Sequence, residues 1–441
     1  ACKIVVPDST LIFSLSIVFS IIILLPFLYY CSFYYITLFN YIICFVMCRK
    51  FLDLGLQPLA NKYLKKKDLI KKKEHLYHLE VGFNAKTKLV SILNTISAEK
   101  MFDNKYPYRS SMSKTMLNSF KKLAQKVTKT FNPNFIIEIG SNDGAFIKNF
   151  DKKKVIGIEP CSNMANITKN MGYKTYSNFW DIKLAKKIKS KVKNIDIIYA
   201  ANTVSHIRNL NSFFNSINHI LSDNGVLIIE DPSLLECFKK VSYDQFYNEH
   251  IYIFSLLSIK NLIKKYKLEV FNIEKLSTHG GSLRYYIKRD SNNKFRTNKK
   301  VKEQLNQEIK FGLDRFSTYI KFSKNVENSR KKLRAIFSKL KKQNKKIIGY
   351  GSTAKVCTIL SFCKITSETL DYFFDTTPNK IGKYMPGSHI YVKRYSKPLT
   401  NEADYVFLGA WNFKKEIFKK EKKYIKNGGK FITHVPVPKI I

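Results

Sequence analysis

The alternation of apolar runs with amphipathic segments predicts buried strands separated by helices from about residue 115 onward. Apolar runs read "FIIEIG", "KVIGIEP", "IDIIYAANTV" and "GVLIIED", and "NSFKKLAQKVTKTF" before the first of them has helical spacing. Short apolar strands separated by helices imply a parallel sheet with helices on both faces. We therefore expect an α/β fold whose first unit occupies residues 115–297.

A second α/β unit is expected toward the C-terminus, since 441 residues allow two to three domains. Residues 298–345 are rich in Lys, Glu and Leu and have the pattern of long helices. They lead into a series of strand-like runs that begins with "KKIIGYGSTAK" and continues with "LDYFFDTTPNKIG", "ADYVFLGAW" and "GGKFITHVPVP". We predict a helical connector and a C-terminal α/β domain over residues 298–441.

The N-terminal segment, residues 1–47, is strongly hydrophobic. Residues 9–48 contain no charged residue, a run longer than the ~20 residues that span a bilayer. Three interpretations stay open: a membrane anchor, a targeting segment that is removed, or an extension foreign to the natural protein. Basic residues from Arg49 onward would keep the rest of an anchored chain on the cytoplasmic side. We expect a cytoplasmic protein that contacts a membrane only through residues 9–48.

The formal net charge of +44 raises nucleic acid as a partner, because a strongly basic surface attracts polyanions. Of the 77 basic residues, however, ten are arginine and 67 are lysine, spread over the whole length. Surfaces dedicated to reading phosphates usually rely on arginine. We expect solvated lysine faces and no nucleic-acid partner. Eight cysteines show no framework spacing, which indicates reduced thiols.

A glycine turn follows the first predicted strand, in "FIIEIGSNDGAFI". Its spacing is E-x-G-x-x-x-G instead of the G-x-G-x-x-G that binds a pyrophosphate, which argues against a nicotinamide-dependent oxidoreductase. An acid at the strand end suits the ammonium group of an amino-acid-bearing cofactor, and a second acid in "IGIEP" suits ribose hydroxyls. We predict S-adenosylmethionine as the cofactor; the alternative is a turn that only connects strand to helix. The predicted ligands are Glu138, Gly140, Asn142, Gly144, Glu159 and Asn202.

A second glycine turn, "YGSTAK" at residues 350–355, is followed by one acid, Asp375. It is a weaker signal, and both a ligand contact and a structural role stay open.

Candidate catalytic groups cluster in "DQFYNEHIYIFS", where Tyr247, Glu249 and His250 occupy four positions. His206 follows the third predicted strand, at the edge where open α/β sheets bind ligands. A lone buried histidine is more often structural than catalytic. Several such groups after predicted strands favour an active site, to which "STHGGSLR" adds the substrate-binding candidates His279 and Arg284.

These motifs, together with "THGGSLR", "GYGSTAK" and "FFDTTPNKIGKYMPGSHI", stand in the order and spacing of the sugar C-methyltransferases. The chain resembles this family from roughly Cys44 to its end, and the family elements "LDLGLQPLANKYL" and "YPYRSSMSKT" are intact. The resemblance implies a small N-terminal domain at residues 48–114, a Rossmann-like class I methyltransferase domain and a C-terminal Rossmann-like α/β domain.

The resemblance also implies the reaction. The family methylates a carbon of a nucleotide-linked 4-keto-6-deoxysugar, next to the ketone. This chemistry needs a base near that carbon and a donor for the developing enolate oxygen. We predict His250 as the base, oriented or assisted by Glu249, Tyr247 and His206, and the family implies that Tyr106 or Tyr108 reaches the same pocket. The alternative is an inactive binding or scaffold protein that keeps the fold.

One part of the family pattern is missing. The family holds zinc with two cysteine pairs, but this chain offers Cys44 and Cys48 for the first pair and no cysteine in "EVGFNAKTKLV", where the second belongs. Structural zinc needs four nitrogen or sulfur ligands. His75 and His78 are weak substitutes, so we predict no metal.

Overall fold

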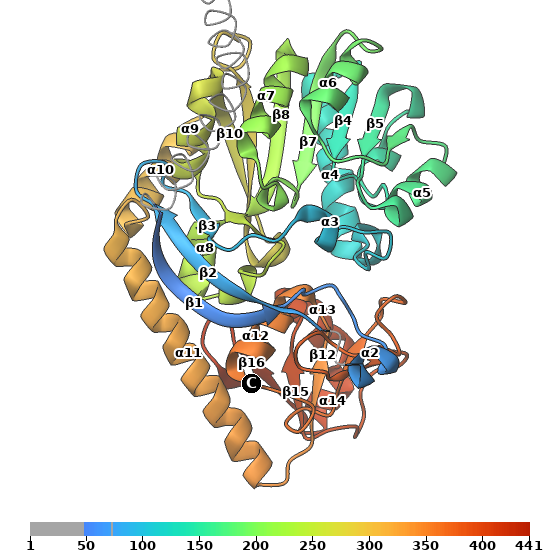
Figure 1. Ribbon diagram of the computed structural model, residues 1–441, viewed down its shortest axis with the longest axis vertical. Coiled ribbons are helices and arrows are strands. Elements are labelled where there is room, and N and C mark those ends of the chain that lie inside the picture. The colour runs from blue at the N-terminus through green and yellow to red at the C-terminus, as the bar shows by residue number, and fades with distance from the viewer. Residues whose placement is uncertain (1–47, 72–73) are drawn as a thin grey trace, which may run out of the picture. The chain divides into compact units, whose positions relative to one another are not determined.

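The computed structural model describes residues 48–71 and 74–441 (Figure 1). The hydrophobic segment, and with it the open question of an anchor, lies outside the described residues. Within those residues, no helix combines the length and the apolar character needed to cross a membrane. Lys50–Ile441 forms one compact unit.

The first part of the described chain forms a four-stranded sheet with the order β1-β2-β3-β9, in which β3 is antiparallel to both β2 and β9. Its strands are β1 (Cys48–Pro58), β2 (Leu76–Asn84), β3 (Val90–Ile92) and β9 (Tyr252–Ile253). The short helix α2 (Lys66–Ile70) lies between β1 and β2 in the chain, and α3 (Ala98–Met101) follows β3. In β2, the apolar residues Leu79, Val81 and Phe83 are buried at every second position, which places them on one face of the strand. Because β9 directly follows the His250 segment, this sheet fixes one end of that segment.

The central sheet has seven strands in the order β10-β11-β8-β7-β4-β5-β6. It contains the four strands expected from the apolar runs, β4 (Ile136–Ile139), β5 (Val155–Ile158), β7 (Ile195–Ala201) and β8 (Leu221–Pro232), and these are parallel. Parallel β6 (Thr175–Tyr176) and the hairpin of β10 (Leu268–Leu276) and β11 (Ser282–Arg289) were not predicted. β11 lies antiparallel between β8 and β10. This is the class I methyltransferase fold, as expected.

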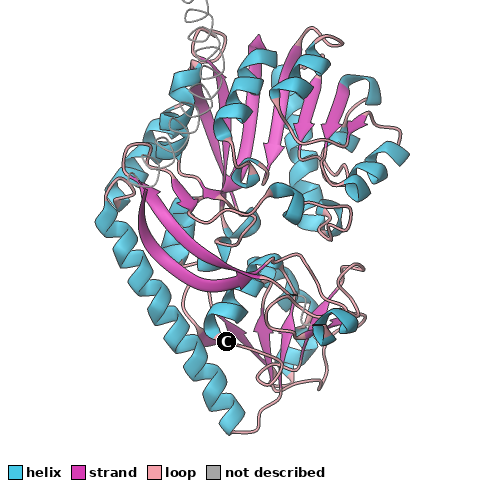
Figure 2. Ribbon diagram, viewed as in Figure 1, coloured by secondary structure: helices cyan, strands magenta, loops and turns pink. Residues whose placement is uncertain are grey.

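Helices cover both faces of this sheet (Figure 2). They are α4 (Lys114–Phe131), α5 (Ser162–Asn170), α6 (Ile182–Lys189), α7 (Leu210–Ile220) and α9 (Leu256–Ile263), whereas α8 (Leu234–Lys240) packs with the N-terminal sheet and the C-terminal part. In α4, the Ser113 hydroxyl caps the helix by accepting from the Met116 N–H, and Phe120, Leu123 and Val127 are buried. The spacing of these apolar residues follows the helical period, which is why the sequence pattern predicted this helix.

The C-terminal part begins with α10 (Lys299–Phe311) and the 27-residue helix α11 (Phe316–Lys342). A six-stranded sheet follows, in the order β14-β13-β12-β15-β16-β17, parallel except for β17. Its strands are β12 (Ile347–Tyr350), β13 (Tyr372–Asp375), β14 (Tyr391–Arg394), β15 (Tyr405–Leu408), β16 (Lys430–Thr433) and β17 (Lys439–Ile440). Its helices are α12 (Ala354–Cys363), α13 (Lys414–Lys420) and α14 (Lys422–Lys426). The additional C-terminal α/β domain is therefore confirmed.

One hydrophobic cluster joins the N-terminal sheet to the C-terminal part. The Phe238 ring of α8 stacks on Phe322 of α11 with a centroid distance of 4.0 Å and an interplanar angle of 4°. Phe51 of β1 contacts both Phe238 and Tyr319 of α11 edge-on. Figure 1 shows α11 running beside the curved β1. The N-terminal sheet thus shares its core with later parts of the chain.

Candidate active site

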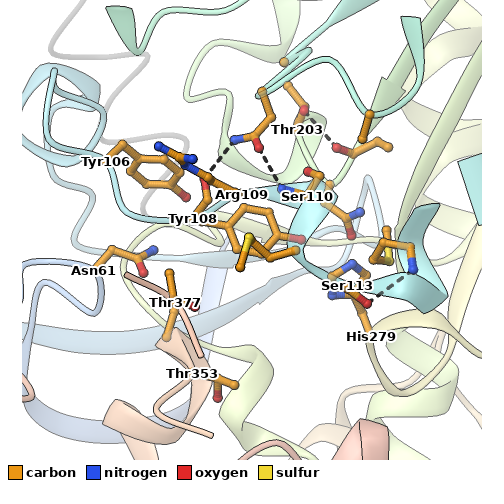
Figure 3. A pocket seen from close by; sticks show the side chains of 18 of the residues that line it. Asn61, Tyr106, Tyr108, Arg109, Ser110, Ser113, Thr203, His279, Thr353 and Thr377 are labelled. Atoms are coloured by element: carbon orange, nitrogen blue, oxygen red, sulfur yellow. Dashed lines mark hydrogen bonds between the residues drawn. The ribbon is translucent and has the colours of Figure 1, made fainter. Parts of the chain in front are cut away.

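A cavity of about 490 Å³ is lined by residues from all described parts of the chain. Its walls come from the turns after β4, β5 and β7, the segment 106–113, residues 247 and 250, and the turn between β12 and α12. Figure 3 shows Tyr106, Tyr108, Arg109 and Ser110 around this hollow together with His279, Thr353 and Thr377. Eleven of the fourteen residues predicted for the site line it: Glu138, Gly140, Asn142, Glu159, Asn202, Tyr106, Tyr108, His206, Tyr247, His250 and His279.

The turn after β4 has a backbone that only small residues tolerate. Gly140 has φ +73°, and a Cβ there would overlap the Thr203 side chain. Gly144 has φ +79°, and its Cβ would lie 3.0 Å from side-chain atoms of Thr168 and Met171. Asn142 between them is also left-handed, with φ +49°. The turn therefore brings bare backbone against the cavity, while Gly144 itself packs against α5 and does not line it.

Two acids flank this turn. Glu138 is 3% exposed, and burial raises the pKa of its carboxyl group well above the usual range. Its Oε2 has no hydrogen-bond partner among the described residues. Glu159 accepts hydrogen bonds from the N–H groups of Asn142 and Cys161, both at 2.8 Å, and burial raises its pKa as well. Glu159 thereby fixes the turn as well as facing the cavity.

Unsatisfied acceptors in this wall fit the predicted cofactor. Besides Glu138, the Oδ1 atom of Asn202 is buried without a partner in the described part of the chain. Ammonium and ribose hydroxyl groups donate hydrogen bonds, and buried acceptors need donors. The residues present therefore suit S-adenosylmethionine at the turn, with Glu138 and Asn202 offering acceptors.

The glycine turn also positions the "YPYRSS" segment. The Asn142 side chain accepts from the Ser110 N–H at 2.9 Å and donates to the Tyr108 carbonyl at 3.2 Å (Figure 3). Tyr106 and Tyr108 thus enter the cavity from a segment that is docked on the cofactor turn.

Tyr247 and His250 form a hydrogen-bonded pair at the cavity. The Tyr247 hydroxyl lies 2.8 Å from Nε2 of His250, and Nδ1 of His250 lies 2.9 Å from the Gln245 carbonyl. A carbonyl only accepts, so Nδ1 carries the proton and Nε2 accepts from the phenol. Burial holds the pKa of His250 well below its usual range. The imidazole is therefore neutral near neutral pH and keeps a basic nitrogen toward Tyr247.

Glu249 does not itself line the cavity but supports a residue that does. Its Oε2 accepts from the Tyr106 hydroxyl at 2.9 Å, and its Oε1 accepts from the Asn61 side chain at 2.8 Å. Burial raises the pKa of Glu249 to about 7, while both donors oppose this shift. Asn61 lines the cavity and was not predicted, although it lies within the "LDLGLQPLANKYL" element.

Two further imidazoles face the same space. The ring of His206 stacks on Phe102 with centroids 5.4 Å apart and lies 5.1 Å from the ring of His250. Burial lowers the pKa of His206 to about 4 and that of His279 to about 3. In both residues, Nε2 has no partner within residues 48–71 and 74–441. Both rings are neutral and can accept or donate one hydrogen bond to a ligand.

The predicted substrate ligand Arg284 lies outside the cavity wall. It is 4% exposed and does not line the cavity. Its guanidinium group donates to Glu230 and to Glu274, each at 2.7 Å. These carboxylates engage the guanidinium group, so the geometry supports a structural role in the β8–β11–β10 sheet and not the predicted substrate contact.

The second glycine turn lines the cavity through Gly351 and Thr353. Asp375 accepts from the N–H and the hydroxyl of Ser352, at 3.0 and 2.8 Å. The Ser352 carbonyl accepts from Lys380 at 2.8 Å and from the hydroxyl of Tyr63. Asp375 therefore holds the turn itself, and cationic side chains gather at this end of the cavity: Lys355, Lys380 and Lys420.

The zinc ligands expected from the family are incomplete here. Within the described residues, no group of three or more His, Cys, Asp or Glu side chains could hold a metal ion. His75 and His78 are exposed on or beside β2. Asn84 instead organises the β2–β3 turn, because its side chain accepts from the N–H groups of Lys86 and Thr87 at 3.0 and 2.9 Å. The residues described do not fit a structural zinc site.

Three family models match consecutive parts of the chain. They are described as "Putative zinc binding domain" (residues 46–102), "Methyltransferase domain" (108–273) and "C-methyltransferase C-terminal domain" (277–436). C-methyltransferase NovU of Streptomyces niveus is 26% identical over 395 residues, which cover 88% of this chain and 93% of NovU.

Similar solved structures include an S-adenosylmethionine-dependent methyltransferase from Clostridium acetobutylicum, at 12% identity and a TM-score of 0.29. It covers 39% of this chain and 92% of its own. Magnesium protoporphyrin IX methyltransferase from Synechocystis with bound S-adenosylmethionine is 10% identical with a TM-score of 0.29, over 39% and 79% of the two chains. Overall similarities this low do not identify a substrate.

Replacing Asn61 with Leu is expected to raise the pKa of Glu249 above about 7, because the carboxylate loses a donor that favours its charged form. The titration can be followed by ¹³C NMR of glutamate carboxyl groups, with the Glu249 signal assigned from Glu249→Gln. Asn94→Leu is the matched control, since Asn94 donates to the more exposed Glu80. An unchanged Glu249 titration in Asn61→Leu would contradict the assigned contact.

Glu159→Ala is expected to weaken S-adenosylmethionine binding by on the order of 1.5–3 kcal/mol, the range for hydrogen bonds to charged groups. Isothermal titration calorimetry measures the affinity, and Glu303→Ala on the exposed side of α10 serves as the control. Equal affinities of the wild type and Glu159→Ala for S-adenosylmethionine would contradict the assignment of Glu159 to the cofactor site.

Elemental analysis of the purified protein is expected to find no stoichiometric zinc, because the second cysteine pair is missing. One tightly held zinc ion per chain would show this expectation to be wrong.

Proposed function

Because this chain belongs to the S-adenosylmethionine-dependent C-methyltransferases, we propose that it methylates a nucleotide-linked 4-keto-6-deoxysugar at the carbon next to the ketone. S-adenosylmethionine supplies the methyl group as an electrophile. The proposal is carried chiefly by one observation: the Tyr247–His250 pair and residues 140–142 of the glycine turn share one cavity. A base beside a methyl donor is what the methylation of a weakly acidic carbon requires.

The cofactor end of the site is formed by the acids and amides around the glycine turn. Glu138 and Asn202 offer unsatisfied buried acceptors, and Glu159 offers a carboxylate that already holds the turn. Trp180, buried with its N–H unpartnered in the described residues, and the exposed Phe179 add aromatic surface on the same wall. These groups would orient the cofactor with its methyl group toward the centre of the cavity.

His250 serves as the base in this proposal. Its Nδ1–H is anchored on a carbonyl, so Nε2 is the nitrogen that can accept a proton. As the C–H bond next to the ketone breaks, its electron pair forms the enolate and its proton ends on Nε2, directly or through the Tyr247 hydroxyl. The lowered pKa of His250 keeps this nitrogen unprotonated near neutral pH.

The developing enolate oxygen needs hydrogen-bond donors. His206 and His279 are neutral imidazoles with unsatisfied Nε2 atoms in the described structure, and each can present an N–H in one tautomer. We assign them to the keto oxygen. Tyr106 is engaged by Glu249, and this bond fixes its ring at the cavity wall.

The nucleotide end is assigned to the C-terminal wall. Lys380 and Lys420 line this wall, and the turn at Thr353 precedes the ten-residue helix α12. Amines and a helix N-terminus stabilise phosphate groups. Tyr395, which also lines this end, offers a ring against which a base can lie.

The proposal is tested by incubating the protein with nucleotide-linked 4-keto-6-deoxysugars and methyl-labelled S-adenosylmethionine. Label attached to the ring carbon next to the ketone, located by NMR of the product, is the expected result. Label on oxygen, or no transfer to any sugar of the panel, would contradict the proposal. Binding of both ligands without transfer would favour the inactive scaffold.

His250→Ala is expected to lower turnover by ~10²–10⁴-fold, the usual contribution of a general base. S-adenosylmethionine affinity should stay unchanged, because the cofactor groups lie on a different wall. His75→Ala, at an exposed position, is the matched control. Near-normal turnover in His250→Ala would move the base to another residue, and a parallel loss of cofactor affinity would indicate a structural role.

A further inference from the structure

The turn of residues 278–281, between β10 and β11, has a strained backbone at the edge of the cavity. His279 has φ +53°, a conformation that is uncommon for a non-glycine residue, and the following Gly280 and Gly281 have φ +91° and +128°. His279 nevertheless lines the cavity with Nε2 unsatisfied among the described residues. Such a backbone persists only when its surroundings fix it.

Hydrogen bonds from three side chains hold this turn. The His279 carbonyl accepts from the Gln245 side chain at 2.6 Å and from the Lys355 amine at 3.0 Å. The Gly280 carbonyl accepts from Lys240 at 2.6 Å. Lys355 belongs to α12 of the C-terminal domain, so a part of the chain that lies far away in sequence fixes this cavity residue.

Trp411 packs directly against the backbone of this turn. A Cβ at residue 280 would overlap the Trp411 ring, so the indole lies directly against the glycine backbone. Its Nε1–H donates to Asp244 at 2.6 Å. Trp411 itself does not line the cavity. Trp411 therefore connects the turn to Asp244, the residue that precedes Gln245.

Gln245 connects this arrangement to the base. Its side chain donates to the His279 carbonyl, while its own carbonyl accepts from Nδ1 of His250. A shift of Gln245 would thus move both imidazoles together. Asp244, which Trp411 anchors, is its neighbour in the chain.

We propose that Trp411 is a positioning residue, through which the C-terminal domain sets the orientation of His279 and His250 in the methyltransferase site. It acts through the Gly280 backbone and the Asp244 carboxylate and touches no reacting atom. The inference concerns these two imidazoles and holds whatever the methylated substrate is.

The test compares Trp411→Ala, Trp411→Phe and Phe418→Ala in the full chain. Phe418 packs against Phe431 in the same domain and controls for lost packing. The imidazole Cε1–H signals of ¹³C-histidine-labelled protein are followed against pH, with His279 and His250 assigned from His→Gln variants. Melting temperature and S-adenosylmethionine affinity are recorded in parallel, so the readouts need no sugar substrate.

In the wild type, burial and the charge of Lys355 lower the pKa of His279 to about 3, so its signal stays that of a neutral ring from pH 5 to 8. Trp411→Ala should open the turn to water, and the pKa should rise toward the ordinary ~6.5, with a shifted His250 signal. Trp411→Phe keeps a ring over Gly280 but loses the hydrogen bond to Asp244. The pKa of His279 in this variant should lie between its values in the wild type and in Trp411→Ala. Phe418→Ala should titrate like the wild type.

Two results would overturn the proposal. One is that His279 and His250 titrate in Trp411→Ala as they do in the wild type. The other is an equal change in Phe418→Ala, which would mean that any loss of packing in this domain disturbs the site. Failure of every sugar in the methyl-transfer panel leaves these histidine signals unaffected, so the two proposals fail separately.

Discussion

The burial of a run of polar groups, residues 244–250, is the constraint on which the rest of the structure depends. All seven residues are buried, and a buried donor or acceptor without a partner costs about 1–3 kcal/mol. Their partners come from every described part of the chain: Pro58, Asn61, Tyr106, His279, Thr358 and Trp411. The N-terminal sheet, the methyltransferase sheet and the C-terminal domain must therefore dock together before these hydrogen bonds form. Strand β9, two residues later, completes the N-terminal sheet.

The features that could be predicted from the sequence are those that depend on local order. Apolar runs and helical spacing indicated most of the parallel strands of both α/β sheets, because burial on two faces leaves a continuous hydrophobic signal. The parallel strands β6 and β14 were missed. The glycine turn was predicted because glycines after a strand let the backbone approach a ligand closely, and Glu159 because it ends the neighbouring strand. The antiparallel β10–β11 hairpin was missed, since its strands mix charged residues with apolar ones.

Contacts between distant residues could not be predicted in the same way. Asn61 and Glu249 are 188 positions apart, and Asp244 and Trp411 are 167 apart, so no periodicity links them. Arg284 had the charge of a substrate ligand, but Glu230 and Glu274, on the strands beside it, take up its guanidinium group. The pairing of His250 with Tyr247 could be expected from the sequence, since three positions separate them. The tautomer of His250 could not, because it follows from the contact of Nδ1 with the Gln245 carbonyl.

The central claim is that this buried segment removes a proton from a carbon of the substrate. Solvent exchange tests it most directly: the protein is incubated in deuterium oxide with a nucleotide-linked 4-keto-6-deoxysugar and S-adenosylhomocysteine, which cannot donate a methyl group. The account predicts deuterium at the carbon next to the ketone, observed by NMR, with the wild type and not with His250→Ala. Exchange that proceeds equally with His250→Ala, or no exchange by a wild type that methylates the same sugar, would contradict it.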